Sequence, residues 1–151
     1  MPRQPVQPEY AHFVFEVSAP QFAYSFSSRL RKHDPEPYWE HPKLELAGKC
    51  LYPAKFADRI GKIDIVADRE LPKPQQGSWR ASGEWIGYLE AGKSKLQYYG
   101  SVPPDALGWV LTGIASGMTR FVTVNGEPLK RGTARIRGCS FDADFFREDF
   151  Y

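Results

Sequence analysis

The chain has 151 residues, a formal net charge of only +2 and a composition of 42% hydrophobic, 15% aromatic and 25% charged residues. This length suits a single domain with its own core, and the near-neutral charge gives no net field that would steer the chain toward nucleic acid or an anionic membrane. No apolar run approaches the roughly 18 residues of a transmembrane helix. The N-terminus lacks the apolar core of a signal peptide, so we expect a cytoplasmic protein.

The N-terminal third predicts two strands and a loop. Residues 1–8 contain three prolines and little apolar surface, which predicts a loose N-terminal arm. Ala11–Ser18 and Phe22–Leu30 each alternate apolar and polar side chains, the pattern of half-buried strands. We expect Pro20 to end the first strand and the two strands to be antiparallel neighbours. Arg31–Pro42 is charged, aromatic and interrupted by three prolines, which predicts a loop.

The middle of the chain predicts four more strands, at Lys43–Tyr52, Arg59–Arg69, Ser78–Glu90 and Lys95–Gly100. A polar connection, Leu71–Gly77, separates the second of these from the third. The last two are predicted to pair as a hairpin across a short turn. The residues expected to share one face of their strands are Leu44, Leu46 and Cys50, then Ile63, Ile65 and Ala67, then Trp79, Trp85 and Leu89.

One segment, Pro103–Ser116, predicts a helix. Apolar residues recur at helical spacing, at Leu107, Val110, Leu111 and Ile114, with Met118 continuing the stripe. Prolines suit the first turn of a helix, and Gly117 suits the left-handed residue just past its end. Trp109 falls on the polar face, so it is either covered by another segment or available as a contact.

Two final strands, Arg120–Val124 and Thr133–Phe141, are predicted to be joined across Asn125-Gly126 and a basic turn that is longer than a minimal hairpin loop. The pattern as a whole predicts a mainly β fold. We expect a single-domain antiparallel β-sandwich or partly closed barrel of about eight strands with one helix. The alternative is an α+β fold with the helix on one sheet.

The sequence predicts no catalytic constellation, no metal site and no cofactor. The histidines His12, His33 and His41 do not follow a regular metal-ligand spacing. Cys50 and Cys139 are far apart and have no Cys or His at ligand spacing, so reduced, buried thiols are expected. No phosphate-binding or dinucleotide-binding loop is present, and Ser116 does not lie in a nucleophile-elbow pattern.

Exposed aromatic residues give the first binding hypothesis. The acidic C-terminal tail, residues 142–151, carries four aromatic residues. Together with Phe141 they make five among the last 11 residues of the chain. Disordered tails normally lack aromatic residues. The residues predicted to contact a partner protein or a second copy are Trp109, Phe145, Phe146, Phe150 and Tyr151.

A basic cluster gives the second binding hypothesis. Lys130 and Arg131 lie in the predicted turn, and Arg135 and Arg137 alternate onto one face of the last strand. A basic stripe interleaved with aromatic rings can hold single-stranded nucleic acid through phosphate contacts and base stacking. The aromatic residues considered for that stacking are Tyr98, Tyr99, Trp85 and Trp39. The competing interpretation is that the two strand arginines pair with the acidic tail or lie on a solvated face.

These observations favour a non-enzymatic β-rich module that binds a partner protein or itself. The alternative is a small-ligand-binding protein or enzyme with a pocket at the barrel mouth, near the Arg31–Pro42 loop. A further alternative is single-stranded nucleic-acid binding through the basic-aromatic face.

Overall fold

Seven strands and one helix account for most of the chain that the structure covers. The computed structural model describes residues 11–28, 38–67 and 85–145. Within these ranges the elements are β1 (Ala11–Ser28), β2 (Tyr38–Tyr52), the 3-10 turn η1 (Ala54–Phe56), β3 (Ile60–Ala67), β4 (Gly87–Ala91), β5 (Lys95–Val102), α1 (Pro104–Ala115), β6 (Phe121–Gly126) and β7 (Thr133–Asp142).

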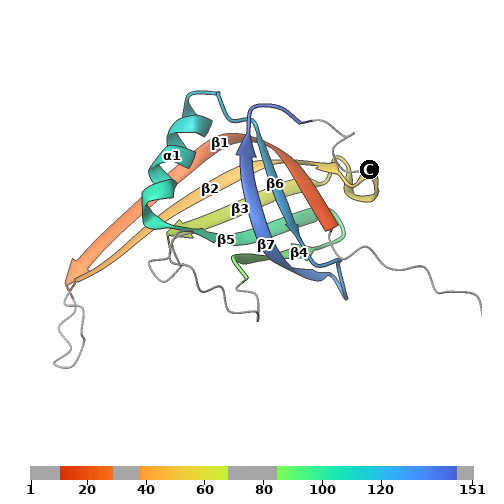
Figure 1. Ribbon diagram of the computed structural model, residues 1–151, viewed down its shortest axis with the longest axis horizontal. Helices are drawn as coiled ribbons and strands as arrows, with labels where there is room; N and C mark the ends of the chain where they lie inside the picture. Colours follow the sequence, from red (N-terminus) through yellow and green to blue (C-terminus); the bar gives the residue numbers. More distant parts are fainter. Residues whose placement is uncertain (1–10, 29–37, 68–84, 146–151) are drawn as a thin grey trace, which may run out of the picture.

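The strands close into a barrel in the order β1-β2-β3-β5-β4-β7-β6, with β6 returning to β1 (Figure 1). The mainly β class and the barrel are confirmed, and the described residues contain one α-helix, as predicted. The barrel is closed, and its β3–β5 ladder is parallel while the other ladders are antiparallel. In the hairpin of β4 and β5, β5 lies between β3 and β4. Strand β5 is antiparallel to β4 and runs parallel to β3.

The two N-terminal strands predicted from the sequence are one strand, β1. The predicted break at Pro20 and the antiparallel pairing of the two halves are therefore wrong. Both halves pair with β2, and the register shifts between Ser18 and Gln21. A proline at such an irregularity removes a donor where the ladder is already interrupted, so the strand continues through it. The merger accounts for seven described strands where the sequence predicts eight.

Three other predicted boundaries need correction. The loop Arg31–Pro42 is wrong at its end, because β2 already begins at Tyr38; residues 29–37 lie outside the described ranges. Asn125 and Gly126 belong to β6, and the turn follows them. The predicted strand Ser78–Glu90 is described only from residue 85, with strand geometry from Gly87 onward. The connection at 71–77 also lies outside the described residues.

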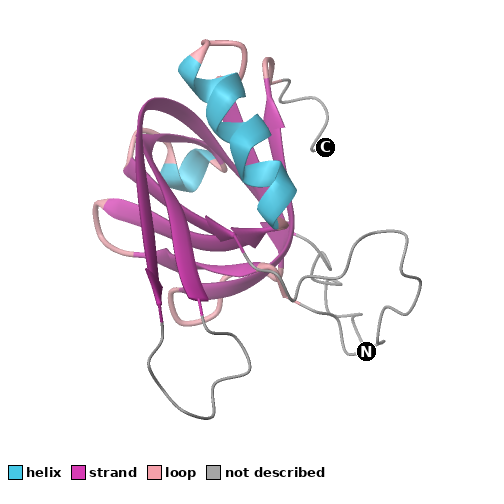
Figure 2. Cartoon of the chain, turned by 90° about the vertical axis from the view of Figure 1, so that its left-hand side faces the viewer, coloured by secondary structure: helices cyan, strands magenta, loops and turns pink. Residues whose placement is uncertain are grey.

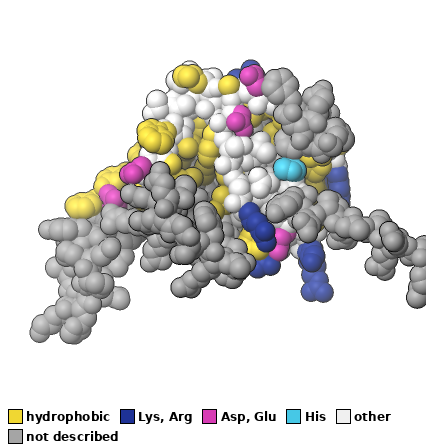
Figure 3. Space-filling view, viewed as in Figure 1, with side chains coloured by type: hydrophobic (Ala, Val, Ile, Leu, Met, Phe, Trp, Pro, Cys, Tyr) yellow, Lys and Arg dark blue, Asp and Glu magenta, His cyan; other side chains and the backbone are white. Residues whose placement is uncertain are grey.

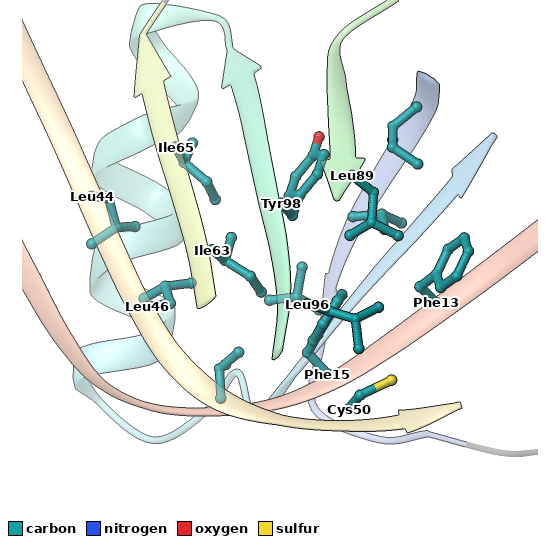
Figure 4. Close-up of a cluster of buried hydrophobic side chains, with 14 of the residues drawn as sticks. Phe13, Phe15, Leu44, Leu46, Cys50, Ile63, Ile65, Leu89, Leu96 and Tyr98 are labelled. Carbon is teal, nitrogen blue, oxygen red and sulfur yellow. The ribbon is translucent and has the colours of Figure 1, made fainter. Parts of the chain in front are cut away.

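Alternating side chains of the strands fill the barrel, as the strand period predicts. Phe13 and Phe15 of β1 meet inward-facing side chains from β2, β3, β4 and β5 in one cluster (Figure 4). The labelled members contributed by those strands are Leu44, Leu46, Cys50, Ile63, Ile65, Leu89, Leu96 and Tyr98. The predicted inward faces of β2 and β3 are confirmed for five residues, all at most 1% exposed: Leu44, Leu46, Cys50, Ile63 and Ile65.

Helix α1 agrees with its prediction to within one residue at each end, and it packs against β1 and β3 (Figure 2). Leu107 and Ile114 enter the core, and Gly117 has the expected positive φ of 78°. Met118 does not continue the buried stripe, because the helix has ended and its side chain is 73% exposed. In the described part of the chain, no helix has the length and apolar character needed to cross a membrane.

Candidate functional site

A two-stranded hairpin extends beyond the barrel, and we call it the hairpin extension: residues 21–28 of β1 and 38–42 of β2 (Figure 1). The β1–β6 ladder ends at Glu16, followed by one further bond in which the Val17 N–H donates to the Arg120 carbonyl. The β2–β3 ladder begins only at Lys43. Within the described residues, therefore, the β1 strand of the extension is paired only with β2, and residues 38–42 of β2 are paired only with β1.

Three aromatic residues alternate along the β1 strand of the hairpin extension. Phe22, Tyr24 and Phe26 are 48%, 55% and 60% exposed. Phe22 is paired directly with Leu44, a core residue, so the two side chains lie on the same face of the sheet. The aromatic face of the extension is therefore a continuation of the inner face of the barrel, beyond the strands that enclose the core. The hydroxyl of Tyr24 donates a hydrogen bond of 2.8 Å to Glu40 Oε2. The alternation along this strand is the one predicted. That pattern predicts a buried aromatic face, whereas all three aromatic side chains are exposed.

The two outer edges of the hairpin extension differ in charge. The β1 edge, from Gln21 to Ser28, reads QFAYSFSS and contains no Asp, Glu, Lys or Arg. The β2 edge carries Glu40 and His41, and Lys43 follows at its junction with the barrel. Charged side chains on an edge strand discourage pairing with another chain. The β1 edge lacks that protection along its length.

Trp109 is the most exposed of the large hydrophobic side chains, at 78%, and lies on the outer face of α1. This exposure supports its availability as a contact. Hydrophobic side chains gather on the side of the molecule that carries α1 and the hairpin extension (Figure 3). Phe145 is half-buried, with its ring centroid 6.1 Å from that of Phe121. The other predicted contact residues, Phe146, Phe150 and Tyr151, lie outside the described residues.

The basic cluster lies on the outer wall of the barrel. Arg135 and Arg137 share the exposed face of β7, as predicted, and their guanidinium carbons lie 4.4 and 4.5 Å from the Trp85 ring centroid. Trp85 therefore lies on the opposite side of the wall from Leu89, which corrects the predicted common face. Arg135 also donates two hydrogen bonds to Glu127, of 3.0 and 2.7 Å.

These contacts bear on the nucleic-acid hypothesis, which stays a prediction. Arg135 is engaged by Glu127, and both strand arginines already lie over an aromatic ring. Arg135 therefore has fewer N–H donors left for phosphate contacts, whereas a position over a ring does not use the donors of Arg137. Lys130 and Arg131 are exposed in the turn between β6 and β7. Tyr98 is 1% exposed and is therefore unavailable for stacking on a base.

The cysteines and histidines are the residues to consider as nucleophiles and metal ligands. Burial raises the pKa of the Cys50 thiol to about 11 and that of Cys139 to about 12. Both thiols are therefore protonated at neutral pH, whereas the thiolate is the nucleophile and metal ligand. Within residues 11–28, 38–67 and 85–145, no three His, Cys, Asp or Glu side chains gather in a group that would hold a metal ion. His33 lies outside those ranges.

The sequence reasoning missed one pair of buried polar residues on the outer wall. Asp64 of β3 and Gln97 of β5 are 8% and 5% exposed, although each faces away from the core. Beside them, Tyr88 and Tyr99 stack with ring centroids 5.5 Å apart and an interplanar angle of 18°. The pair could not be found from periodicity, because their strands alternate as expected and only the three-dimensional neighbours cause the burial.

Searches with the sequence and the structure find no matching family model, no matching curated protein and no matching solved structure. Function is therefore inferred from the geometry of this chain alone.

Proposed function

We propose that this protein is a non-enzymatic association module that pairs with a second copy of itself through the β1 edge of the hairpin extension. The observation that carries the proposal is the uncharged β1 edge from Gln21 to Ser28, along which β2 is the one described strand that pairs with β1 and three aromatic residues are exposed. Self-association belongs to the class of function that the exposed aromatic residues of the sequence favour.

The energetics of the hairpin extension support a covering partner. An isolated two-stranded hairpin is at best marginally stable in water, and three or more strands with an apolar face are needed for independent stability. A long, uncharged, aromatic edge strand is also a template for pairing with another chain. Addition of one strand satisfies the open backbone groups and adds aromatic contacts at the same time.

A second copy fits this edge because identical strands can pair antiparallel about a two-fold axis, so that each contact is made twice. Pairing centred on Tyr24 places Phe22 opposite Phe26 of the partner subunit, and Phe26 opposite the partner subunit's Phe22. Aromatic pairs directly across two strands stabilise a sheet by about 0.2–1 kcal/mol each. The absence of charge on this edge means that the two copies meet without like-charge repulsion.

Sedimentation velocity from about 1 to 100 μM tests the proposal, since this range brackets a micromolar dissociation constant. We expect the wild-type chain to sediment increasingly as a dimer. Ala23→Lys combined with Ser25→Lys introduces opposed like charges across the two-fold axis, and we expect that variant to remain a monomer. Ala47→Lys is the matched control, because Ala47 is exposed on β2 but lies where both edges of its strand are paired. It is expected to leave the dimer intact.

Trp109→Ala gives a second readout. Since the side chain is exposed, we expect its truncation to leave the unfolding free energy nearly unchanged, within about 0.5 kcal/mol. Weaker association in this variant extends the interface from the hairpin extension to α1. A wild-type chain that stays monomeric at the highest concentration contradicts the proposal, as does a dimer that both lysine variants leave equally intact.

A further inference from the structure

A pocket of about 330 Å³ opens on the outer wall of the barrel, where β2, β3, β5 and the start of β4 lie side by side. It lies away from the β1 edge of the hairpin extension, although His41 of the extension's β2 strand lines it. Its polar side chains come from alternate positions of three strands: His41 and Lys43, then Asp64, then Tyr99 and Ser101. Val66 and Ile86 add apolar surface. The volume is sufficient for a compact organic molecule.

Asp64 is the unusual residue of this pocket. Only 8% of its surface is exposed, and it lines the pocket. Gln97 Nε2 donates a hydrogen bond of 3.3 Å to Asp64 Oδ2, while Asp64 Oδ1 is buried without a hydrogen-bond partner. An unpaired buried polar atom costs about 1–3 kcal/mol, and more when the group is charged. An unpaired buried oxygen in a residue that lines a pocket calls for an explanation, and a bound donor is one that the pocket can provide.

The charges around Asp64 favour a cationic ligand. Lys43 is the nearby cation, and its ammonium group forms an ion pair of 2.9 Å with Glu45. The hydrogen bond to Glu45, assisted by the negative charge of Asp64, raises the pKa of Lys43. Lys43 is thus directed to Glu45, on which Lys62 also acts, and within the described residues no ion pair joins a cation to Asp64.

Tyr99 supplies a wall of the pocket suited to the same ligand. Its ring is held in place by stacking on Tyr88, whose hydroxyl donates to Glu90. The face of an aromatic ring attracts an organic cation, and it also packs against flat or apolar groups. A carboxylate acceptor and an aromatic wall in one pocket are the two elements that recognition of an amine requires.

We propose that this pocket binds a small organic cation, a primary amine with a flat apolar part, whose ammonium group donates to Asp64 and whose apolar part packs against Tyr99. The inference does not depend on self-association, because Asp64 and Tyr99 lie on the barrel wall and not on the β1 edge of the hairpin extension. Binding requires no covalent step.

Benzylamine and benzyl alcohol are the probes, since they share a ring and differ in the charged donor. Titrations of the full-length ¹⁵N-labelled protein are followed through the backbone amide signals of Gly100 and Ser101. We expect saturable shifts with benzylamine and binding of benzyl alcohol weaker by about tenfold or more, the factor that corresponds to 1.4 kcal/mol. Equal binding of the two probes, or the absence of saturable shifts at these amides, overturns the proposal.

Asp64→Asn tests the carboxylate while it keeps the shape of the side chain. We expect benzylamine binding to weaken by about tenfold or more. The melting temperature should change little, because asparagine keeps the shape of the side chain and an oxygen that can accept from Gln97. Asp105→Asn, on the exposed first turn of α1, is the matched control and is expected to bind like wild type. Wild-type affinity in Asp64→Asn overturns the proposal.

Tyr99→Leu keeps the proposal testable if Asp64→Asn fails to fold. Tyr99 is 41% exposed, so its replacement is compatible with a folded barrel. We expect benzylamine to bind this variant more weakly by about threefold to tenfold, in line with the loss of a cation–π contact. Unchanged benzylamine affinity in Tyr99→Leu counts against the proposed aromatic wall and overturns the assignment.

Discussion

Strand β1 passes through two environments, and its aromatic residues differ in exposure accordingly. In its barrel half, Phe13 and Phe15 are at most 2% exposed, because β2 and β6 pair with both edges and the other strands close over the inner face. In the hairpin extension, Phe22 and Phe26 are about half exposed, and among the described strands β2 pairs with one edge and none pairs with the other. The same alternating pattern therefore gives a core in one half and an open surface in the other.

The contrast shows that alternation decides which side chains share a face, whereas burial depends on what covers that face. A half-exposed phenylalanine has only part of the stabilisation available from removing its apolar surface from water, at about 25 cal/mol per Å². In the barrel half of β1, the aromatic side chains are thus already fully buried. The extension has apolar area left to bury, and this remaining area is what the proposed dimer uses.

The largest expected effect comes from truncating one aromatic residue in each half of β1. Phe15→Ala removes a fully buried side chain and leaves a cavity, so we expect a loss of about 3–5 kcal/mol in unfolding free energy. Phe26→Ala removes an exposed side chain, and we expect a change within about 0.5 kcal/mol. Urea denaturation below about 1 μM, where the proposed dimer dissociates, measures both. Equal losses in the two variants would break the comparison.

The sequence predicts the parts of this molecule that local periodicity controls. The helical spacing of Leu107 and Ile114 gives α1 to within one residue at each end, and strand alternation identifies Leu44 and Ile63 as core residues. Gly117 follows from the requirement for a left-handed residue after the helix. Each of these features depends on interactions within a few residues along the chain.

Features that depend on distant strands were not predictable from one sequence. Pro20 is an ordinary strand terminator, yet β2 pairs with β1 on both sides of it. The side of the wall on which Trp85 lies is determined by Arg135 and Arg137, which come some fifty residues later in the chain. The burial of Asp64 likewise arises from neighbours on β2 and β5. The candidate ligand pocket therefore emerged only from the fold.

A smaller effect is expected where the barrel half of β1 meets β2 most closely. A Cβ atom at Gly48 would overlap the backbone carbonyl of Glu16, so the two strands can accommodate a side chain there only by moving apart. We expect Gly48→Ala to cost about 1–3 kcal/mol in chemical denaturation. Gly108→Ala is the control of opposite sign: no atom lies within 4 Å of its added Cβ, and alanine in a helix interior gains about 1 kcal/mol. A neutral Gly48→Ala would mean that the strand separation is not constrained there.

The last expected effect depends on pH and concerns Cys50, which lies opposite Phe15 and faces the same core. Burial raises the pKa of its thiol from about 9 to about 11, and the thiol donates a hydrogen bond of 3.3 Å to the Tyr52 carbonyl. The folded state therefore holds this proton to a higher pH than the unfolded state does. The associated stability is fully present below pH 9 and is lost as the pH rises toward 11.

Over that window we expect the thiol to reduce the unfolding free energy by about 1.4 kcal/mol for each pH unit. Other groups also titrate there, so the measurement is the difference in pH slope between wild type and Cys50→Ala in urea denaturation at pH 8, 9, 10 and 11. Because Cys50→Ala lacks the proton, the two slopes should agree from pH 8 to 9 and diverge above pH 9. Parallel slopes up to pH 11 would show that water reaches the thiol, and the barrel half of β1 would then be less completely enclosed than its contrast with the hairpin extension requires.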